Sequence, residues 1–358
     1  MYIAFLINDI TRSGGTERIT ITLANSFLRH GHHVTIISNL REYSQLHFNL
    51  DANIKVLYVH PIYKKKKKRL SRMIEYLKTI PLLKNTLKNN RFDLIIGQSF
   101  PMNAMLFFAK GKIKQIACEH TFYSYYSSKI LRSFRILLYR KVSTVVVLNK
   151  LDYKCFKKHI HNVRLIPNMN YLKPSTIQSS LKNKVIISAG RLNFQKGFDL
   201  LIEAMSIVVT KHKDWVLHIY GKGSYREQLE EQIQRLNLEE NVILKGNLND
   251  LTKAYLDSSI YVLPSRFEGF GLVLIEAASF GLPIISFDCP SGPSDILNND
   301  LGILVPNGDV QQLAESIMRM IEEPQLRMSY ARKGKEIVEK YDEEKIYPLW
   351  NDLFCSLS

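Results

Sequence analysis

The chain has 358 residues, of which 46% are hydrophobic and 23% are charged, so it has ample material for globular cores and is long enough for two domains. Its four cysteines are far apart and form no CxxC pair, which excludes the common disulfide frameworks and zinc sites. No apolar stretch reaches the length of a membrane span and no secretory leader is recognisable, so we expect a cytosolic protein that folds in water.

The net charge of +16 is divided unequally along the chain. Residues 1–172 carry 29 Lys and Arg against 8 Asp and Glu, a net of +21, whereas residues 173–358 carry 20 against 25, a net of −5. Such a basic half suits an anionic surface, either lipid or nucleic acid. The basic residues that predict this surface are the run from Lys64 to Arg69 and Arg72, Lys78, Lys84, Lys88, Lys129, Arg132, Arg135, Arg140 and Lys141.

The first half alternates strand-like apolar runs with helical patterns. The first strand, 2–8, leads into a loop with Gly14 and Gly15, and Thr16 is expected to cap the helix that follows. The loop lacks the GxGxxG pattern, so it predicts an anion-binding turn and not a dinucleotide site. The other expected elements are strands at 33–38, 54–59, 92–97, 113–118 and 144–148, and helices at 70–88, 102–109 and 129–141. This alternation is typical of a doubly wound parallel sheet.

A polar, proline-bearing stretch at 172–176 predicts the domain boundary. We therefore expect one domain at 1–172 and a second at 173–339, with a C-terminal helix, 340–358, that crosses back to the first domain. The elements expected in the second are strands at 184–189, 216–220, 242–244, 260–263, 283–287 and 302–305, and helices at 199–210, 225–236, 251–256, 272–279 and 311–322. The fold class is thus α/β, with two Rossmann-like doubly wound domains.

Two loops of the second half carry residues suited to a nucleotide-linked ligand. In open parallel sheets ligands bind beyond the carboxyl ends of strands, and both loops directly follow an expected strand. The loop 190–197 holds Arg191 and Lys196, two cations that suit a diphosphate. The segment 266–277 holds Glu268 in a glycine-rich turn and Glu276 on a helix whose start suits a phosphate. Carboxylates on either side of a phosphate are well placed to accept hydrogen bonds from sugar hydroxyls.

Together these motifs resemble those of the family 4 retaining glycosyltransferases of GT-B fold. The resemblance rests on the Gly14-Gly15 loop, on the GRLxxxKG loop at 190–197 and on the EGFG turn with Glu268 and Glu276 in E-x7-E spacing, in that order along essentially the whole chain. It implies two domains that face each other across a cleft. It also implies transfer, with retention of configuration, of a hexose or N-acetylhexosamine from a UDP-sugar to a hydroxyl of a lipid-linked oligosaccharide, in the assembly of O-antigen, capsule or lipopolysaccharide.

The resemblance also assigns roles to individual residues. Glu276 would hold the ribose hydroxyls, and Glu268 would contact the transferred sugar as a catalytic, orienting group. His120 follows a first-domain strand and would lie close to the donor sugar as a second catalytic residue. The residues implied to bind the donor are Gly14, Gly15, Arg191, Lys196, Phe270, Gly271, Leu272 and Glu276. No DxD-type metal site accompanies them, so neither a metal nor another cofactor is expected.

Two other functions fit parts of the sequence. A sugar-nucleotide epimerase shares the GT-B architecture but has no acceptor. A nucleic-acid-binding protein would explain the basic half, although no RNA-binding signature is present. We favour a partner set of a nucleotide-sugar donor, a lipid-linked acceptor and an anionic membrane surface, without nucleic acid. The expected location is then the cytoplasmic face of the inner membrane.

Overall fold

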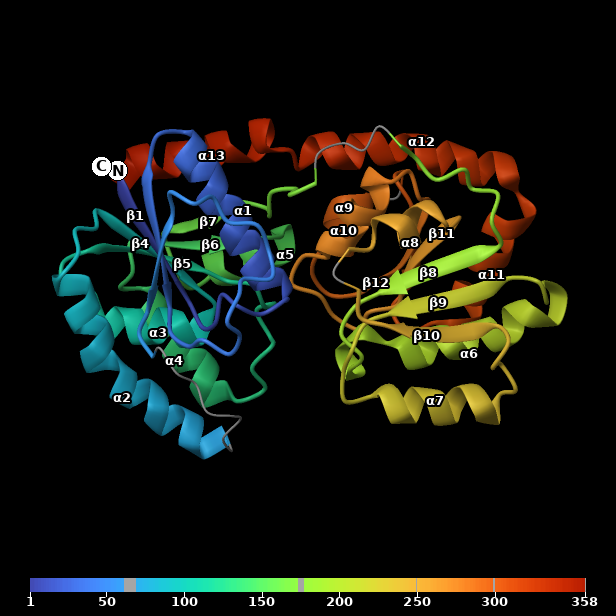
Figure 1. Cartoon of the computed structure of the whole chain (residues 1–358), viewed down its shortest axis with the longest axis horizontal. Helices are drawn as coiled ribbons and strands as arrows, with labels where there is room; N and C mark the ends of the chain where they lie inside the picture. The colour runs from blue at the N-terminus through green and yellow to red at the C-terminus, as the bar shows by residue number, and fades with distance from the viewer. Residues whose placement is uncertain (61–68, 173–176, 249, 299, 358) are drawn as a thin grey trace. The chain divides into compact units, whose positions relative to one another are not determined.

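The computed structural model describes residues 1–60, 69–172, 177–248, 250–298 and 300–357 (Figure 1). The chain forms two compact units: unit 1 comprises Met1–Tyr171 and Glu343–Ser358, and unit 2 comprises Leu172–Asp342. The boundary between the first segment of unit 1 and unit 2 lies between residues 171 and 172. The sequence predicts this boundary one residue later, between 172 and 173. The predicted cleft between two facing domains stays a prediction.

Unit 1 is built on a seven-stranded parallel sheet in the order β3-β2-β1-β4-β5-β6-β7. The chain starts in the middle of the sheet, winds to one edge and then returns to build the other side, which places the change of direction between β1 and β4. The strands, which are mostly apolar and, apart from β3, largely buried, are β1 (Tyr2–Ile7), β2 (His33–Ser38), β3 (Lys55–Tyr58), β4 (Leu94–Gln98), β5 (Lys114–Cys118), β6 (Thr144–Val147) and β7 (Val163–Leu165).

Helices cover both faces of this sheet. Ala4, Leu6 and Ile95 pack on α2 (Arg69–Lys88) and α3 (Phe100–Ala109). On the same face, Ala117 and Val145 pack with residues of α4 (Lys129–Tyr139) and α5 (Lys150–Lys157). The opposite face receives α1 (Gly15–Arg29), whose Phe27 stacks on Phe5 with ring centroids 5.6 Å apart.

The C-terminal helix α13 (Glu343–Leu357) is part of unit 1. Its Trp350 and Phe354 meet the Phe27 ring edge-on, with centroid distances of 5.5 and 5.1 Å. At its first turn, Glu343 accepts a hydrogen bond from Ser26 (2.7 Å) and pairs with Arg29. The last helix of the chain thereby completes the core that begins with the first strand.

Unit 2 repeats the same winding in a six-stranded parallel sheet, β10-β9-β8-β11-β12-β13. Its strands are β8 (Val185–Ala189), β9 (Val216–Tyr220), β10 (Val242–Gly246), β11 (Ile260–Leu263), β12 (Ile284–Asp288) and β13 (Ile303–Pro306). Its helices are α6 (Phe198–Lys211), α7 (Arg226–Arg235), α8 (Thr252–Leu256), α9 (Leu272–Ser279), α10 (Pro293–Leu297), α11 (Val310–Glu322) and α12 (Pro324–Lys340). The two sheets confirm the predicted α/β class with two Rossmann-like domains.

Some local expectations differ from the structure. Thr16 is not the cap of α1: the helix starts at Gly15, with Gly14 as the N-cap and no side-chain cap bond. The short elements α5, β7 and α10 were not predicted from the sequence. The run Lys64–Lys68 lies outside the described residues.

Candidate functional site

The two loops that the sequence analysis singled out follow neighbouring strands of unit 2. β8 and β11 pair in parallel, with Ile260 beside Ile186 and Tyr261 beside Ile187. These strands flank the point where the strand order reverses, which is where ligands bind in open α/β sheets. The loop after β8 (190–197) and the loop after β11 (264–271) therefore emerge side by side at this switch point.

The loops are fastened to each other through their backbones. Gly197 has φ +63°, and a Cβ at this position would lie 2.0 Å from the carbonyl oxygen of Pro264. The Arg266 N–H donates to the Gln195 carbonyl (2.8 Å), and the Gln195 amide donates to the Phe267 carbonyl (3.0 Å). Only glycine fits at position 197, because both the backbone conformation and the close approach exclude a side chain.

This contact brings Lys196 and Glu268 together. Lys196 Nζ lies 2.6 Å from Glu268 Oε1, and the Ser265 hydroxyl donates to the same oxygen at 2.6 Å. The residue Glu268 is 6% exposed, and the Lys196 ammonium and the Ser265 hydroxyl replace water around its carboxylate. An ammonium group has three donors, of which Glu268 engages one. The structure thus unites the predicted sugar-contacting carboxylate and a predicted diphosphate-binding cation.

Arg191 lies on the same loop but takes a different position. Its side chain is exposed, whereas the Lys196 side chain runs past Gly190, where a Cβ would lie 3.1 Å from Lys196 Cε. Within the described part of the chain, Arg191 forms no ion pair. A second basic residue nearby, Arg266, holds Asp199 in a bidentate pair (2.8 and 2.6 Å) and fixes the start of α6.

Glu276 projects from α9, the helix that follows the Glu268 turn. It is 7% exposed, and its Oε2 accepts a hydrogen bond from the Tyr255 hydroxyl at 3.1 Å. The Tyr255 ring stacks on Phe280 with a centroid distance of 5.2 Å, which holds the hydroxyl in place. The sequence analysis missed Tyr255, since nothing along the chain relates position 255 to position 276.

The start of α9 is formed by Phe270, Gly271 and Leu272. Gly271, with φ +97°, is the N-cap and provides no side chain. The first N–H groups of a helix have no acceptor within it, and they carry partial positive charge. Gly292 brings the loop after β12 against this turn: a Cβ at Gly292 would lie 2.2 Å from the Phe270 carbonyl oxygen. The geometry therefore offers backbone donors beside the Lys196–Glu268 pair.

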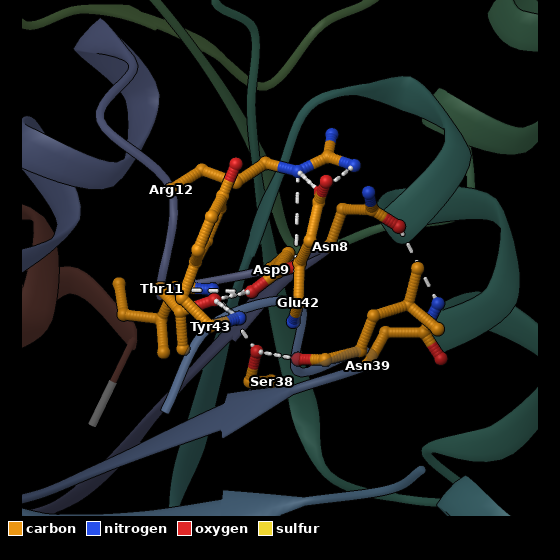
Figure 2. A network of polar contacts seen from close by, with 10 residues as sticks. Asn8, Asp9, Thr11, Arg12, Ser38, Asn39, Glu42 and Tyr43 are labelled. Carbon is orange, nitrogen blue, oxygen red and sulfur yellow. Dashed lines mark hydrogen bonds and ion pairs between the residues drawn. The ribbon is translucent and has the colours of Figure 1, made fainter. Parts of the chain in front are cut away.

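In unit 1, the buried carboxylate of Asp9 holds the start of the loop after β1, as Figure 2 shows. Asp9 Oδ1 accepts from the Thr11 N–H (3.0 Å) and the Thr11 hydroxyl (2.6 Å). Asp9 Oδ2 accepts from the Glu42 N–H (3.0 Å), and Arg12 Nε donates to the Glu42 carboxylate (2.8 Å). The loops after β1 and β2 are thereby joined. The sequence analysis did not identify this network.

His120 lies two residues beyond the end of β5, and its Nε2 forms a hydrogen bond with Gln98 Oε1 at the end of β4. Burial lowers the pKa of His120 to about 4, so the imidazole is neutral near pH 7. His120, Gly14 and Gly15 belong to unit 1, and their predicted action on a donor held by unit 2 stays a prediction.

Beside His120, a cluster of ionisable side chains is buried in unit 1. The Tyr139 hydroxyl donates to Glu119 Oε1, and Arg135 Nη1 lies 3.9 Å from Glu119 Oε2. Arg135 is fully buried and lies over the rings of Tyr123 and Tyr126. Arg135 was predicted to be one of the cations of an anion-binding surface, and this prediction was wrong because its side chain lies in the interior of the domain.

Among the described residues, no group of three or more His, Cys, Asp and Glu side chains is placed to hold a metal ion. No helix in the same part of the chain is long and apolar enough to cross a membrane.

Two protein-family models match almost the whole chain. The model described as Glycosyltransferase Family 4 matches residues 13–169, and the model described as Glycosyl transferases group 1 matches residues 172–337. An uncharacterized glycosyltransferase of Haemophilus influenzae is 29% identical over 98% of this chain and 99% of its own length. The amylovoran biosynthesis glycosyltransferase AmsD of Erwinia amylovora is 28% identical over 97% of this chain and 98% of its own length.

A third relative matches in part. The Campylobacter jejuni N-acetylgalactosamine-N,N'-diacetylbacillosaminyl-diphospho-undecaprenol 4-alpha-N-acetylgalactosaminyltransferase is 34% identical over 47% of this chain and 45% of its own length. Among solved structures, a variant of S. aureus TarM in complex with Fondaparinux, alpha-GlcNAc-glycerol and UDP has a TM-score of 0.84 and 19% identity, covering 99% of this chain and 100% of TarM. The pneumococcal O-GlcNAc transferase GtfA, in complex with UDP and GlcNAc, has a TM-score of 0.80 and 17% identity. The match covers 100% of this chain and 99% of the GtfA chain.

Proposed function

The chain belongs to the family 4 glycosyltransferases of GT-B fold, and from this premise we propose that it moves a hexose or N-acetylhexosamine from a UDP-sugar to a hydroxyl of a lipid-linked saccharide, with retention of the anomeric configuration. The observation that carries the proposal is the Lys196–Glu268 ion pair at the switch point of unit 2, next to the start of α9. A cation, a carboxylate and backbone N–H groups at one place are what a nucleotide-linked sugar requires.

Each residue then has a task in the transfer. Glu276, oriented by Tyr255, accepts hydrogen bonds from the ribose hydroxyls. Departure of UDP leaves negative charge on the diphosphate, and Lys196, Arg191 and the α9 amides stabilise that charge from fixed positions. Glu268, held by Lys196 and Ser265, orients a hydroxyl of the transferred sugar. A protein cation supplies the charge, so the reaction is expected to need no metal.

The leaving phosphate acts as the base that takes the proton of the acceptor hydroxyl in this mechanism. His120 contributes as a neutral hydrogen-bonding group near the donor sugar, because its pKa of about 4 keeps it uncharged near pH 7. The proposed bond changes balance: the sugar–phosphate bond breaks, the new glycosidic bond forms, and the acceptor proton leaves with UDP.

The acceptor class is supported by the relatives. One is named for transfer to a diphospho-undecaprenol-linked sugar, and another for amylovoran biosynthesis. Together with the basic first half, these names favour a lipid-linked acceptor in the assembly of a surface polysaccharide such as O-antigen, capsule or lipopolysaccharide. They also favour peripheral attachment to the cytoplasmic face of the membrane. UDP as the nucleotide is supported by the ligands named for TarM and GtfA.

A donor panel tests the proposal. The protein is incubated with UDP- and GDP-sugars, with and without a polyprenyl-diphosphate sugar, and release of the nucleoside diphosphate is measured. We expect a UDP-sugar to release UDP only when the acceptor is present. NMR of the product should show the same anomeric configuration as in the donor. Glu276→Ala should release no UDP. Epimerised donor formed without acceptor would instead establish the epimerase, and affinity for RNA without turnover would replace both enzymes by a nucleic-acid-binding protein.

A further inference from the structure

Three helices of unit 1 form one layer on the sheet. α2 contacts α3, and α3 contacts α4, on the face that carries Ala4, Leu6 and Ala117 (Figure 1). The inner side of α4 is fixed by Arg135, Leu138 and Tyr139, which are all buried. The opposite side of α4 is therefore held toward the outside and cannot turn into the core.

That outer side is apolar. Ile130, Phe134 and Leu137 are 84%, 41% and 53% exposed. Their spacing of four and three residues places them in one row on the helix, about 10 Å long at 1.5 Å per residue. The neighbouring helices add further exposed apolar side chains to the same layer: Leu77, Leu82 and Phe108. Single exposed apolar residues are ordinary, but a row of them backed by a layer of others marks an interaction surface.

The charged residues of α4 are all basic, and α3 has no charged residue. Neither helix contains an Asp or Glu, and the sequence of α2 contains only Glu75. The exposed basic residues of the layer and its borders are Lys78, Lys84, Lys88, Lys129, Arg140 and Lys141. The surface thus combines a protruding apolar row with a positive surround.

We propose that this face of α2, α3 and α4 docks on an anionic lipid bilayer, with Ile130, Phe134 and Leu137 entering the boundary between headgroups and acyl chains. The pattern of apolar residues framed by cations is that of an interfacial helix. A bilayer accepts protruding side chains without a matching pocket. A protein partner would need an acidic surface with a separate apolar pocket for each of the three side chains. Docking would bring the enzyme to the membrane that holds its lipid-linked acceptor. This part of the inference rests on the proposed function.

Vesicle co-sedimentation of the full-length protein tests the docking. Vesicles of phosphatidylcholine alone are compared with equimolar phosphatidylcholine and phosphatidylglycerol. We expect binding to the anionic vesicles only. The triple variant Ile130→Ser, Phe134→Ser, Leu137→Ser should have a partition coefficient for the anionic vesicles that is lower by about tenfold or more, because its helix α4 no longer buries apolar side chains in the bilayer. A charge variant, Lys129→Gln, Arg140→Gln, Lys141→Gln, should lower it about fivefold per charge removed. Leu151→Ser, an exposed apolar change on α5 of the same unit, should leave it unchanged.

A fluorescent reporter covers the case in which the triple variant folds poorly. The two native tryptophans, Trp215 and Trp350, are buried, so a new surface tryptophan gives a separate signal. In Phe134→Trp we expect a blue shift on addition of anionic vesicles, and in Leu151→Trp no shift. An unshifted Phe134→Trp, or a triple variant that folds by circular dichroism and partitions like the wild type, would overturn the proposal. So would a triple variant that loses only self-association in analytical ultracentrifugation, since the row would then bind a second copy.

Transfer to a soluble, short-chain acceptor separates this proposal from the proposed function. The triple variant should keep wild-type turnover with the soluble acceptor and lose it with the long-chain acceptor in vesicles. Vesicle binding through α4 in a protein without transfer to either acceptor would contradict the function and leave the docking intact.

Discussion

Lys196 Nζ lies 2.6 Å from Glu268 Oε1, although the two residues are 72 positions apart. The contact exists because β8 and β11 are neighbours in the sheet and each delivers its loop to the same edge. A phosphate that approaches Lys196 adds a second acceptor to an ammonium that already has a carboxylate partner. In the proposed function, the pair binds the donor diphosphate and orients its sugar at one place.

Lys196→Met should strongly reduce catalysis. It removes the cation that is proposed to stabilise the leaving diphosphate, and it leaves Glu268 buried beside an apolar chain. We expect kcat/KM to fall by about 10²- to 10³-fold, the usual cost of deleting one preorganised electrostatic group. The measurement is acceptor-dependent release of UDP under steady-state conditions.

The matched control is Lys184→Met, which deletes the lysine of an ion pair whose two side chains are both exposed. Exposed pairs contribute little to stability, so this variant should behave like the wild type. If Lys196→Met and Lys184→Met have equal kcat/KM, Lys196 does not take part in catalysis.

Tyr255→Phe should weaken donor binding without much change in turnover. The hydroxyl that donates to Glu276 Oε2 at 3.1 Å is lost, while the stacking on Phe280 is retained. A hydrogen bond to a charged group contributes about 1.5–3 kcal/mol, so we expect KM for the UDP-sugar to rise by about tenfold or more. Tyr330→Phe, on α12, is the control. A KM equal to that of the wild type would show that Tyr255 does not set the position of Glu276.

Gly197→Ala should separate the two loops of the site. The substitution costs about 1–2 kcal/mol for its left-handed backbone, and its Cβ would also meet the Pro264 carbonyl oxygen at 2.0 Å. Gly308→Ala is matched in backbone, with φ +85°, but has open space around the new Cβ. Thermal unfolding and kcat/KM of both variants isolate the effect of the contact. We expect Gly197→Ala to lose stability and activity together, beyond the loss in Gly308→Ala; similar losses in both would argue against a role for the contact.

The sequence predicted well those elements whose ends are marked by their own residues. β11 ends at Leu263 before Pro264, and α9 spans 272–279 between Gly271 and Gly281, both as predicted. The C-terminal helix predicted at 340–358 is α13, which spans Glu343–Leu357. In these places the local chemistry alone stops one element and starts the next.

What the sequence left undetermined depends on contacts between distant residues. A count of charges cannot distinguish Arg135, which is buried under aromatic rings, from the exposed Lys129 of the same helix. The bonds that join Asp9 to the Glu42 loop, and Tyr255 to Glu276, likewise exist only once strands are adjacent. The motifs could name Lys196 and Glu268, but only the fold shows that they are partners.

His120 should make the stability of the protein depend on pH in a defined window. Burial lowers the pKa of His120 to about 4, whereas an unfolded histidine has a pKa near 6.5. Between these values the unfolded chain binds a proton that the folded chain excludes, so the free energy of unfolding falls as the pH drops from about 6.5 to 4 and levels off below. At pH 5 the loss is about 2 kcal/mol.

Replacement of His120 by asparagine tests this linkage, because it removes the titrating group. Urea unfolding of the wild type and of His120→Asn is measured at pH 7 and at pH 5, and the two differences in unfolding free energy are compared. We expect the wild type to lose about 1–2 kcal/mol more than the variant over this interval. His161→Asn, which changes an exposed histidine, should follow the wild type. If His120→Asn loses as much stability as the wild type between pH 7 and pH 5, the pKa of His120 is not lowered as described above.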